Sequence, residues 1–266
     1  MVPRPDLAPD PSLSQAEMEA LQEEIADVAV FADRDLAFDP AEPAALSNPL
    51  AATAGGGDPP TVVGVDQSFL LTDDDREDRA ISAVVATRAG EVVERVSAVT
   101  PLEIPYIPGL LSFREGGPIL AALSELSVEP DLALFDGSGR IHFRQAGIAT
   151  HMGVVADFPS VGVAKSLLCG TPRGETEGLA EGDRVAIEAD GDVDAPKGTL
   201  LGYAVQSRQY DSPGRHINPL YVSSGHRVGS ETAAGAVLEL CSGYKLPEPV
   251  RLADAYAEDV KGEYVE

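Results

Sequence analysis

The sequence predicts one mixed α/β domain with helices on both faces of a central sheet, and three observations lead to this prediction. Three strand-like segments follow one another between residues 61 and 100. Helix-like and strand-like segments then alternate as far as residue 241. The composition, 44% hydrophobic and 24% charged, is that of a globular chain with a buried core. A meander followed by such an alternation is typical of a mixed sheet with helices packed against it.

The first sixty residues are expected to lie outside this sheet. Ser14 and Glu17 have the spacing of a capping box, and apolar residues then recur at helical spacing as far as about Ala32. Residues 33–60 are rich in Pro and Gly and predict a connector. We therefore assign residues 1–60 to a tail, a helix and a linker.

From residue 61 onward the hydrophobic pattern becomes that of strands and short helices. The expected strands are Thr61–Leu70, Ala80–Thr87, Val92–Thr100, Asp131–Phe135, Val161–Ala164, Arg184–Glu188, Leu200–Ser207 and Leu220–Ser223. The expected helices are Phe113–Leu126, 142–156 and Glu231–Cys241. We take residues 61–245 as the main domain and residues 246–266 as an acidic C-terminal segment.

Length and composition exclude several classes of protein. A chain of 266 residues forms one large domain or two small ones. It has no apolar run long enough for a transmembrane helix, and its N-terminus lacks the apolar region of a secretory signal. Cys169 and Cys241 are too few for a disulfide framework and lack the spacing of a metal site. We expect a cytoplasmic protein without membrane contact.

Charge is the unusual property of this chain. Nineteen basic and forty-four acidic residues give a net charge of −25, which would repel nucleic acid at low salt. Salt near 1 M shortens the Debye length to about 3 Å and screens that repulsion, so the pattern favours a solvated acidic surface in a salty cytoplasm. Residues 101–230 carry a net charge of only −6, against −19 for the rest, and the candidate functional residues concentrate there.

Two acids lie in or at the end of otherwise apolar strands. Asp66 is in the segment GVDQSF, and Asp136 ends the segment LALFD before a Gly-rich turn. Each could be a surface or turn residue. If instead they lie together on neighbouring strands, they repel, and each tends to hold a proton unless a cation sits between them. Such an all-oxygen pair suits Mg²⁺ or Mn²⁺.

A proline-bounded loop follows the meander. Pro105 and Pro108 fix its backbone, and Gly109 allows a close approach by a ligand. A rigid loop that presents Tyr106 can wedge between stacked bases. The alternative is a hydrophobic connector with Tyr106 buried in the core.

Lysine and histidine residues supply further candidates. Lys165 ends a short strand in a chain with only four lysines, which suggests a role for its charge. His226 is placed in a loop with Gly and Ser neighbours. His142 and His151 are nine residues apart, so they do not form a helical zinc pair, and His151 is expected to be a packed helix residue.

Five sequence blocks together resemble the endonuclease V family, whose members nick DNA near deoxyinosine and whose relatives include enzymes that cut inosine-containing RNA. The blocks have the family's spacing over roughly residues 61–240 and read GVDQSF, PYIPGLLSFRE, DGSGRIHFRQAGIATHMG, SVGVAKSLL and PLYVSSGHR. The resemblance implies an RNase H-like fold with a five-stranded type of sheet. The acidic balance fits a haloarchaeal member. Phe143 stands where the family usually has Pro, and the acidic insertion TDDDRED has no clear counterpart.

The resemblance implies a catalytic centre. Asp66 and Asp136 match the family's metal ligands, and Glu115 matches a third acid of the centre. Lys165 and His226 match further catalytic residues of the same centre.

The resemblance also implies a set of DNA-binding residues. Tyr106 matches the residue that wedges the strands apart. Gly109, Leu111 and Gly137 match positions whose main chain surrounds an extruded base, and His142 lies in the same motif.

The function implied is that of a DNA repair endonuclease that hydrolyses a phosphodiester bond on the 3′ side of deoxyinosine and leaves a 3′-hydroxyl and a 5′-phosphate. Mg²⁺ is the implied cofactor, with Mn²⁺ as a substitute. Two alternatives stay open. One is an RNase H-like nuclease for inosine-containing RNA or branched DNA, and the other is a catalytically silent nucleic-acid- or protein-binding module on the same fold.

Overall fold

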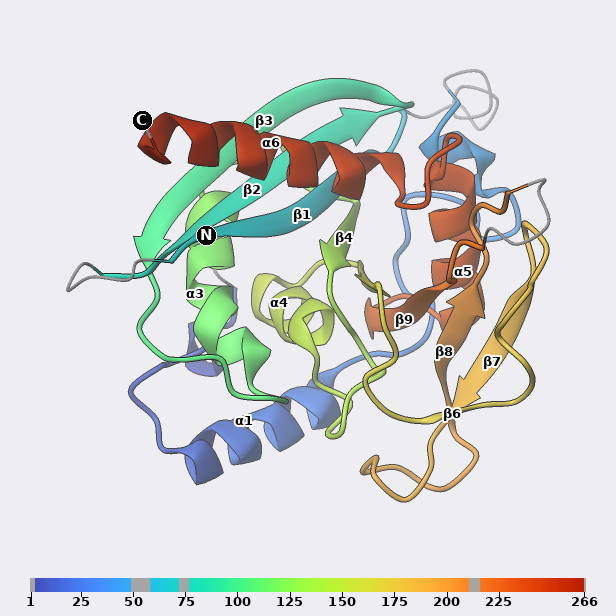
Figure 1. Ribbon diagram of the computed structural model, residues 1–266, viewed down its shortest axis with the longest axis horizontal. Helices are drawn as coiled ribbons and strands as arrows, with labels where there is room; N and C mark the ends of the chain where they lie inside the picture. Colours follow the sequence, from blue (N-terminus) through green and yellow to red (C-terminus); the bar gives the residue numbers. More distant parts are fainter. Residues whose placement is uncertain (1–2, 49–57, 72–76, 211–215, 266) are drawn as a thin grey trace.

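The computed structural model describes residues 3–48, 58–71, 77–210 and 216–265. In this part of the chain, nine strands form one sheet in the order β3-β2-β1-β4-β5-β9-β8-β7-β6 (Figure 1). The first five strands of that order, β3 to β5, form the five-stranded type of sheet that the resemblance implied. Four more strands extend it from the far edge of β5, and three of these, β7, β8 and β9, were also expected from the sequence. Most of the acidic insertion after Leu70, residues 72–76, lies outside the described residues.

The meander forms as predicted. Its strands are β1 Thr61–Leu70, β2 Arg79–Arg88 and β3 Glu91–Pro101, and each pairs antiparallel with the next. Seven of the first eight residues of β1 are buried, because helices cover both faces of this strand. A strand buried on both faces can hold a carboxylate away from water, which is the setting of Asp66.

Two parallel strands continue the sheet beyond β1. They are β4 Leu132–Asp136 and β5 Ser160–Ala164, with α3 Leu111–Leu123 and α4 Ile148–Ala156 packed on one face. The helix predicted over 142–156 begins only at Ile148, because residues 142–145 form a turn that the Gln145 amide closes by donating to the His142 carbonyl. His151 is fully buried in α4, as predicted.

The remaining strands are antiparallel and carry the rest of the core. They are β6 Thr171–Pro172, β7 Arg184–Glu188, β8 Leu200–Val205 and β9 Leu220–His226, and α5 Ser230–Leu240 packs against β8 and β9. The strand predicted to stop at Ser223 runs on to His226, so this histidine is part of the sheet and the prediction of a loop there was wrong.

Both ends of the chain contribute buried residues to this core. Helix α6, Glu248–Val265, lies across β1 and β2, and a side chain at Gly64 would collide with the backbone of Pro249 (Figure 1). Its residues Val250, Ala253 and Ala257 are buried at helical spacing. The domain boundary predicted at residue 245 therefore separates α6 from the face of the sheet that α6 covers.

The N-terminal region is tied down in the same way. Helix α1, Gln15–Val28, begins at the predicted Ser14–Glu17 capping box, and Leu7, Ile25 and Leu46 are 0–1% exposed. Leu7 lies in a short 3₁₀ turn, η1 Pro5–Leu7, and Leu46 lies in another, η2 Pro43–Leu46. No helix among the described residues is long and apolar enough to cross a membrane.

Candidate active site

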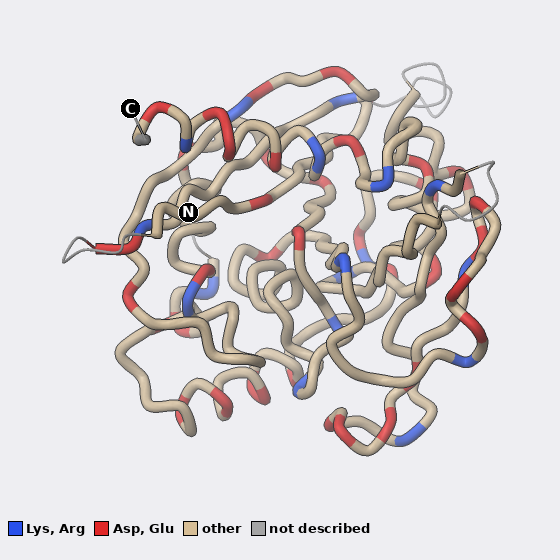
Figure 2. Tube along the Cα trace, in the orientation of Figure 1, with Lys and Arg blue, Asp and Glu red and all other residues tan. Residues whose placement is uncertain are grey.

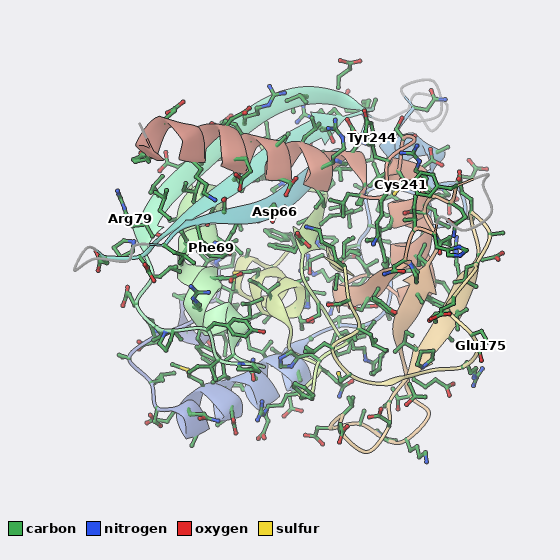
Figure 3. The ribbon with its side chains drawn as sticks, in the orientation of Figure 1. Asp66, Phe69, Arg79, Glu175, Cys241 and Tyr244 are labelled. Carbon is green, nitrogen blue, oxygen red and sulfur yellow. The ribbon has the colours of Figure 1, made fainter. Side chains whose placement is uncertain are left out.

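Two carboxylates meet at the same level of two adjacent parallel strands. Val65 of β1 is in register with Phe135 of β4. The next residues of the two strands, Asp66 and Asp136, therefore lie side by side. Figure 3 shows Asp66 on β1 beneath α6, near the middle of the molecule. Parallel pairing thus brings together two acids that are seventy residues apart in the sequence.

Asp66 is only partly satisfied in its buried position. It is 8% exposed, and its Oδ1 accepts a hydrogen bond from the Gln67 amide at 2.7 Å. Its Oδ2 is buried without a hydrogen-bond partner. Burial, followed by the negative charge of Asp136, raises the pKa of Asp66 well above its ordinary value. An uncompensated carboxylate oxygen in such a place costs stability unless a cation compensates it.

Lys165 supplies the nearest positive charge. It directly follows β5, and its Nζ donates to Asp136 Oδ2 at 2.5 Å. Burial alone would lower the pKa of Lys165, but the hydrogen bond and charge of Asp136, together with the charge of Asp66, raise it. The lysine therefore stays protonated and holds one oxygen of Asp136, which leaves Asp66 Oδ2 unpaired.

Glu115 lines the same cavity as the two aspartates. It projects from α3 and is 9% exposed, and burial raises its pKa to about 7, with a smaller contribution from the charge of Asp136. A cavity of about 190 Å³ is lined by Asp66, Gln67, Glu115 and Asp136 together with apolar residues of the surrounding elements. Asp136 is thus the shared neighbour of Asp66, Glu115 and Lys165.

One acid of this site was not among the residues predicted from the sequence. Asp254 on α6 lies close enough for its charge to raise the pKa of both Asp66 and Lys165. The C-terminal segment was treated as an acidic extension, although its buried apolar residues have helical spacing. That spacing could have predicted the helix. Nothing in the sequence alone placed Asp254 beside Asp66.

The residues present fit a hard divalent cation. No three or more His, Cys, Asp or Glu side chains converge to hold a metal by themselves in the part of the chain that the structure describes. Mg²⁺ is usually bound by only one or two carboxylates, together with water and substrate phosphate. The unpaired Oδ2 of Asp66 beside Asp136 provides such a pair of carboxylates.

The proline-bounded loop lies at the N-terminal end of α3. Tyr106 is 61% exposed, which excludes its alternative as a core tyrosine, while Ile104 and Ile107 pack inward against Leu110 and Phe113. Gly109 has a φ of +80°, a conformation that favours glycine.

A buried histidine joins this loop to the segment that follows Asp136. His142 is 3% exposed, and its Nε2 lies 3.1 Å from the carbonyl oxygen of Gly109. Its Nδ1 accepts from the Arg144 amide, so Nε2 carries the proton and donates to that carbonyl. Burial lowers the pKa of His142 to about 4, so the ring is neutral. Leu111 begins α3, and Gly137 follows Asp136, so both lie in the segments that His142 connects.

His226 lies at the opposite end of β5 from Asp136, so the structure does not bring it to the predicted catalytic centre. It pairs with Ser160 at the start of β5, whereas Asp136 pairs with Val163, three residues or roughly 10 Å further along. Its Nδ1 accepts from the Val30 amide, and its Nε2 is 3.7 Å from Asp157. His226 therefore holds the segment after α1 against the sheet.

Comparisons with known proteins agree with this geometry. The family model described as Endonuclease V matches residues 46–255. The chain is 55% identical over 267 residues to endonuclease V of the haloarchaeon Haloarcula marismortui, covering 97% of this chain and 96% of the relative. A crystal structure of endonuclease V from Streptomyces avermitilis is 28% identical and covers 95% of each chain, with a TM-score of 0.72.

A nucleic-acid complex is also among the similar structures. It is Ciona intestinalis endonuclease V with a 24mer DNA containing an inosine followed by a ribo-adenosine. It is 25% identical to this chain, covers 94% of it and 98% of the Ciona chain, and has a TM-score of 0.68. These likenesses confirm the predicted RNase H-like fold. From the family match and the identity to its haloarchaeal relative, we conclude that the chain belongs to the endonuclease V family.

Proposed function

We propose that this protein is a DNA repair endonuclease that hydrolyses a phosphodiester bond on the 3′ side of deoxyinosine and leaves a 3′-hydroxyl and a 5′-phosphate. Endonuclease V enzymes are metal-dependent nucleases. The observation that carries the proposal is the unpaired Oδ2 of Asp66 beside the Asp136–Lys165 ion pair. This arrangement supports a cation site at Asp66 and Asp136, with the fixed positive charge of Lys165 where a phosphate could lie.

The cofactor in this proposal is Mg²⁺, which Mn²⁺ could replace. Asp66 and Asp136 would hold it, with Glu115 as a third acid and Asp254 as a further neighbour. When bound, the ion would lower the pKa of a water molecule and neutralise charge that develops on the phosphate. Compensating the unpaired oxygen of Asp66 would also remove the cost of its burial.

The protein's own groups contribute the remaining chemistry. Lys165 is protonated and half-exposed, so it can approach a non-bridging or leaving oxygen while it still orients Asp136. Glu115 sits in the same cavity as both aspartates. With a pKa of about 7 it can take up or release a proton near neutral pH.

Recognition of the base is assigned to the loop of Tyr106 and its neighbours. The exposed ring of Tyr106 would occupy the space that an extruded base leaves in the duplex. Gly109, Leu111 and Gly137 would surround that base, and His142 would hold the Gly109 carbonyl in place. Extrusion costs a few kcal/mol and costs least for a mispaired base, which favours deoxyinosine over an undamaged pair.

A second substrate is supported by one observation. The strand bound by the Ciona relative has a ribonucleotide directly after the inosine. An enzyme of this shape can therefore accept a 2′-hydroxyl at that position, and inosine-containing RNA is a candidate substrate of this protein as well.

The test is a nicking assay on matched oligonucleotides. A duplex with a single deoxyinosine, the same duplex with deoxyadenosine, and an inosine-containing RNA are incubated in Mg²⁺ and molar KCl, which matches the salty cytoplasm that the acid-rich trace in Figure 2 suggests. We expect one cut on the 3′ side of deoxyinosine and none in the control. Cutting of the RNA alone would make RNA the substrate, and cutting of neither would overturn the proposal.

A further inference from the structure

A buried glutamine on α1 has no role in the predicted centre. Gln22 is 0% exposed, although its neighbours on the buried side of the helix, Met18 and Ile25, are apolar. An amide buried at such a position costs stability unless its donor and acceptor are both used. Both are used, and both partners lie far away in the sequence.

The side chain of Gln22 connects α1 to the two loops of the base-recognition region. Its Nε2 donates to the carbonyl oxygen of Gly109 at 2.8 Å, and its Oε1 accepts from Arg144 Nη1 at 3.2 Å. Arg144 also forms an ion pair with Glu19, one turn earlier on α1, at 2.9 Å. The helix thus holds the loop before α3 and the loop after β4 at the same time.

The carbonyl of Gly109 is fixed from two sides. Gln22 donates to it from α1, and the neutral ring of His142 donates to it from the other loop. Two donors fix the direction of a carbonyl more closely than one, and they leave the Gly109 peptide little freedom to rotate. Gly109 is also the residue of this loop with a positive φ, where a rotated peptide would be tolerated.

Apolar packing supports the same connection. Met18 packs with Leu110 and Phe113, which flank the start of α3, and Ile104 and Ile107 pack onto this cluster. Tyr106 lies between these two isoleucines and points outward. Helix α1 therefore supports the whole loop, although the family model begins only at residue 46.

We propose that Gln22 is a positioning residue for lesion recognition, through which α1 sets the Gly109 carbonyl and so the selectivity for deoxyinosine. The inference rests on the proposed function. A base pocket built from main-chain groups discriminates only if those groups are held in place, because small displacements of a hydrogen-bonding group weaken discrimination. Gln22 acts through Gly109 and is not assigned any contact with the substrate.

The test measures selectivity of binding rather than activity. Affinity is titrated in EDTA and molar KCl for a labelled duplex with one deoxyinosine and for the same duplex with deoxyadenosine. The two affinities give a discrimination ratio. Gln22→Met keeps the size of the side chain but removes both polar contacts. Gln22→Glu keeps an acceptor for Arg144 and, when ionised, replaces the donor to Gly109 with a second acceptor oxygen. Ile25→Val is the matched control, because Ile25 is buried on the same helix in a cluster with Val154 and Val155 and not with the loop.

We expect both Gln22 variants to lower the discrimination ratio about tenfold, the effect of losing one hydrogen bond of about 1.4 kcal/mol. Ile25→Val should lower the melting temperature and keep the ratio within about twofold. An unchanged ratio in both Gln22 variants, or an equal loss in Ile25→Val, would overturn the inference. Gln22→Glu decides the matter if Gln22→Met does not fold. A wild-type protein without preference for deoxyinosine would instead overturn the proposed function, and with it this inference.

Discussion

Two clusters of charged and imidazole groups lie at opposite ends of the central strands, and they differ in how well their members are satisfied. At one end, Asp66 has a buried oxygen without a partner, beside Asp136 and Lys165. At the other end, His226 accepts from Val30 and faces Asp157, which is 2.6 Å from Arg227. Both clusters contain groups that catalyse reactions in other proteins. Only the first keeps a buried carboxylate oxygen without a hydrogen-bond partner.

The difference shows what distinguishes a reactive site from a structural one. The groups around His226 are paired with one another through hydrogen bonds and an ion pair. These contacts hold the segment after α1 and the C-terminal end of α4 against the sheet. Burial, together with the negative charge of Asp136, raises the pKa values of Asp66 and Glu115, and ionising these buried carboxylates costs stability in the absence of a cation. Residue type made both clusters candidates, and the pattern of contacts separates them.

The largest expected effect is the loss of cleavage at the carboxylate end. Asp136→Asn removes a charge from the centre of Asp66, Glu115 and Lys165 and should lower kcat for the deoxyinosine duplex about a thousandfold or more. The melting temperature should stay the same or rise, since like charges no longer repel. Near-normal nicking by this variant in saturating Mg²⁺ would remove Asp136 from the centre.

A smaller effect is expected at the exposed loop on the same side. Tyr106→Ala should weaken binding of the deoxyinosine duplex by about 1–3 kcal/mol, the value of one base-stacking contact. The melting temperature should not change, because the ring is 61% exposed. Tyr106→Phe should bind like the wild type. Fluorescence titration and calorimetry test this, and a large loss of stability with normal binding would show that Tyr106 supports the fold instead.

The opposite pattern is expected for the other end of the sheet. His226→Ala leaves the Val30 amide without its acceptor and should lower the free energy of unfolding by about 2 kcal/mol. Its kcat, measured below the melting temperature, should stay within about twofold of the wild type. Urea unfolding and the nicking assay measure both quantities. A variant that is stable but inactive would return His226 to the catalytic centre.

The two ends should also limit stability on opposite sides of the pH scale. Burial raises the pKa of Glu115 from 4.5 to about 7, so its protonated form stabilises the fold, and this stability is lost as pH rises from 4.5 through about 7. Burial lowers the pKa of His226, so stability is lost there as pH falls below 6.5. In metal-free urea titrations, Glu115→Gln should remove about 1 kcal/mol of the loss between pH 5 and pH 6.5. An unchanged profile would contradict the assignment.

Most of the fold could be predicted because its elements carry local signals. The strands Thr61–Leu70 and Arg184–Glu188 have the predicted bounds, and the capping box starts α1 as expected. The role of the two ends could not be predicted, because it depends on packing between distant segments. Leu46 lies in a Pro-rich stretch, yet it is fully buried in the core beside α5.

The site was predicted in part for the same reason. Three charged residues end, follow or interrupt apolar strands, namely Asp66, Asp136 and Lys165. Parallel pairing of β1, β4 and β5 then brings these residues to the same end of the strands. The position of His226 was predicted wrongly because β9 runs antiparallel to β5. The last residue of β9 therefore lies beside the first residue of β5, at the opposite end of the strand from Lys165. No local pattern could show that Asp254 and Gln22 reach the site and the loop from the ends of the chain.

Binding of Mg²⁺ to three proteins tests whether the cation site lies at Asp66 and Asp136. Isothermal titration of wild type, Asp136→Asn and His226→Gln with MgCl₂, in molar KCl at pH 8, separates the two ends of the sheet. We expect saturable binding by the wild type, equal binding by His226→Gln and none detectable in Asp136→Asn, since Asp66 and Asp136 are the proposed ligands of the cation. Unchanged binding by Asp136→Asn, or its loss in His226→Gln, would show that the cation is not held by this pair of carboxylates.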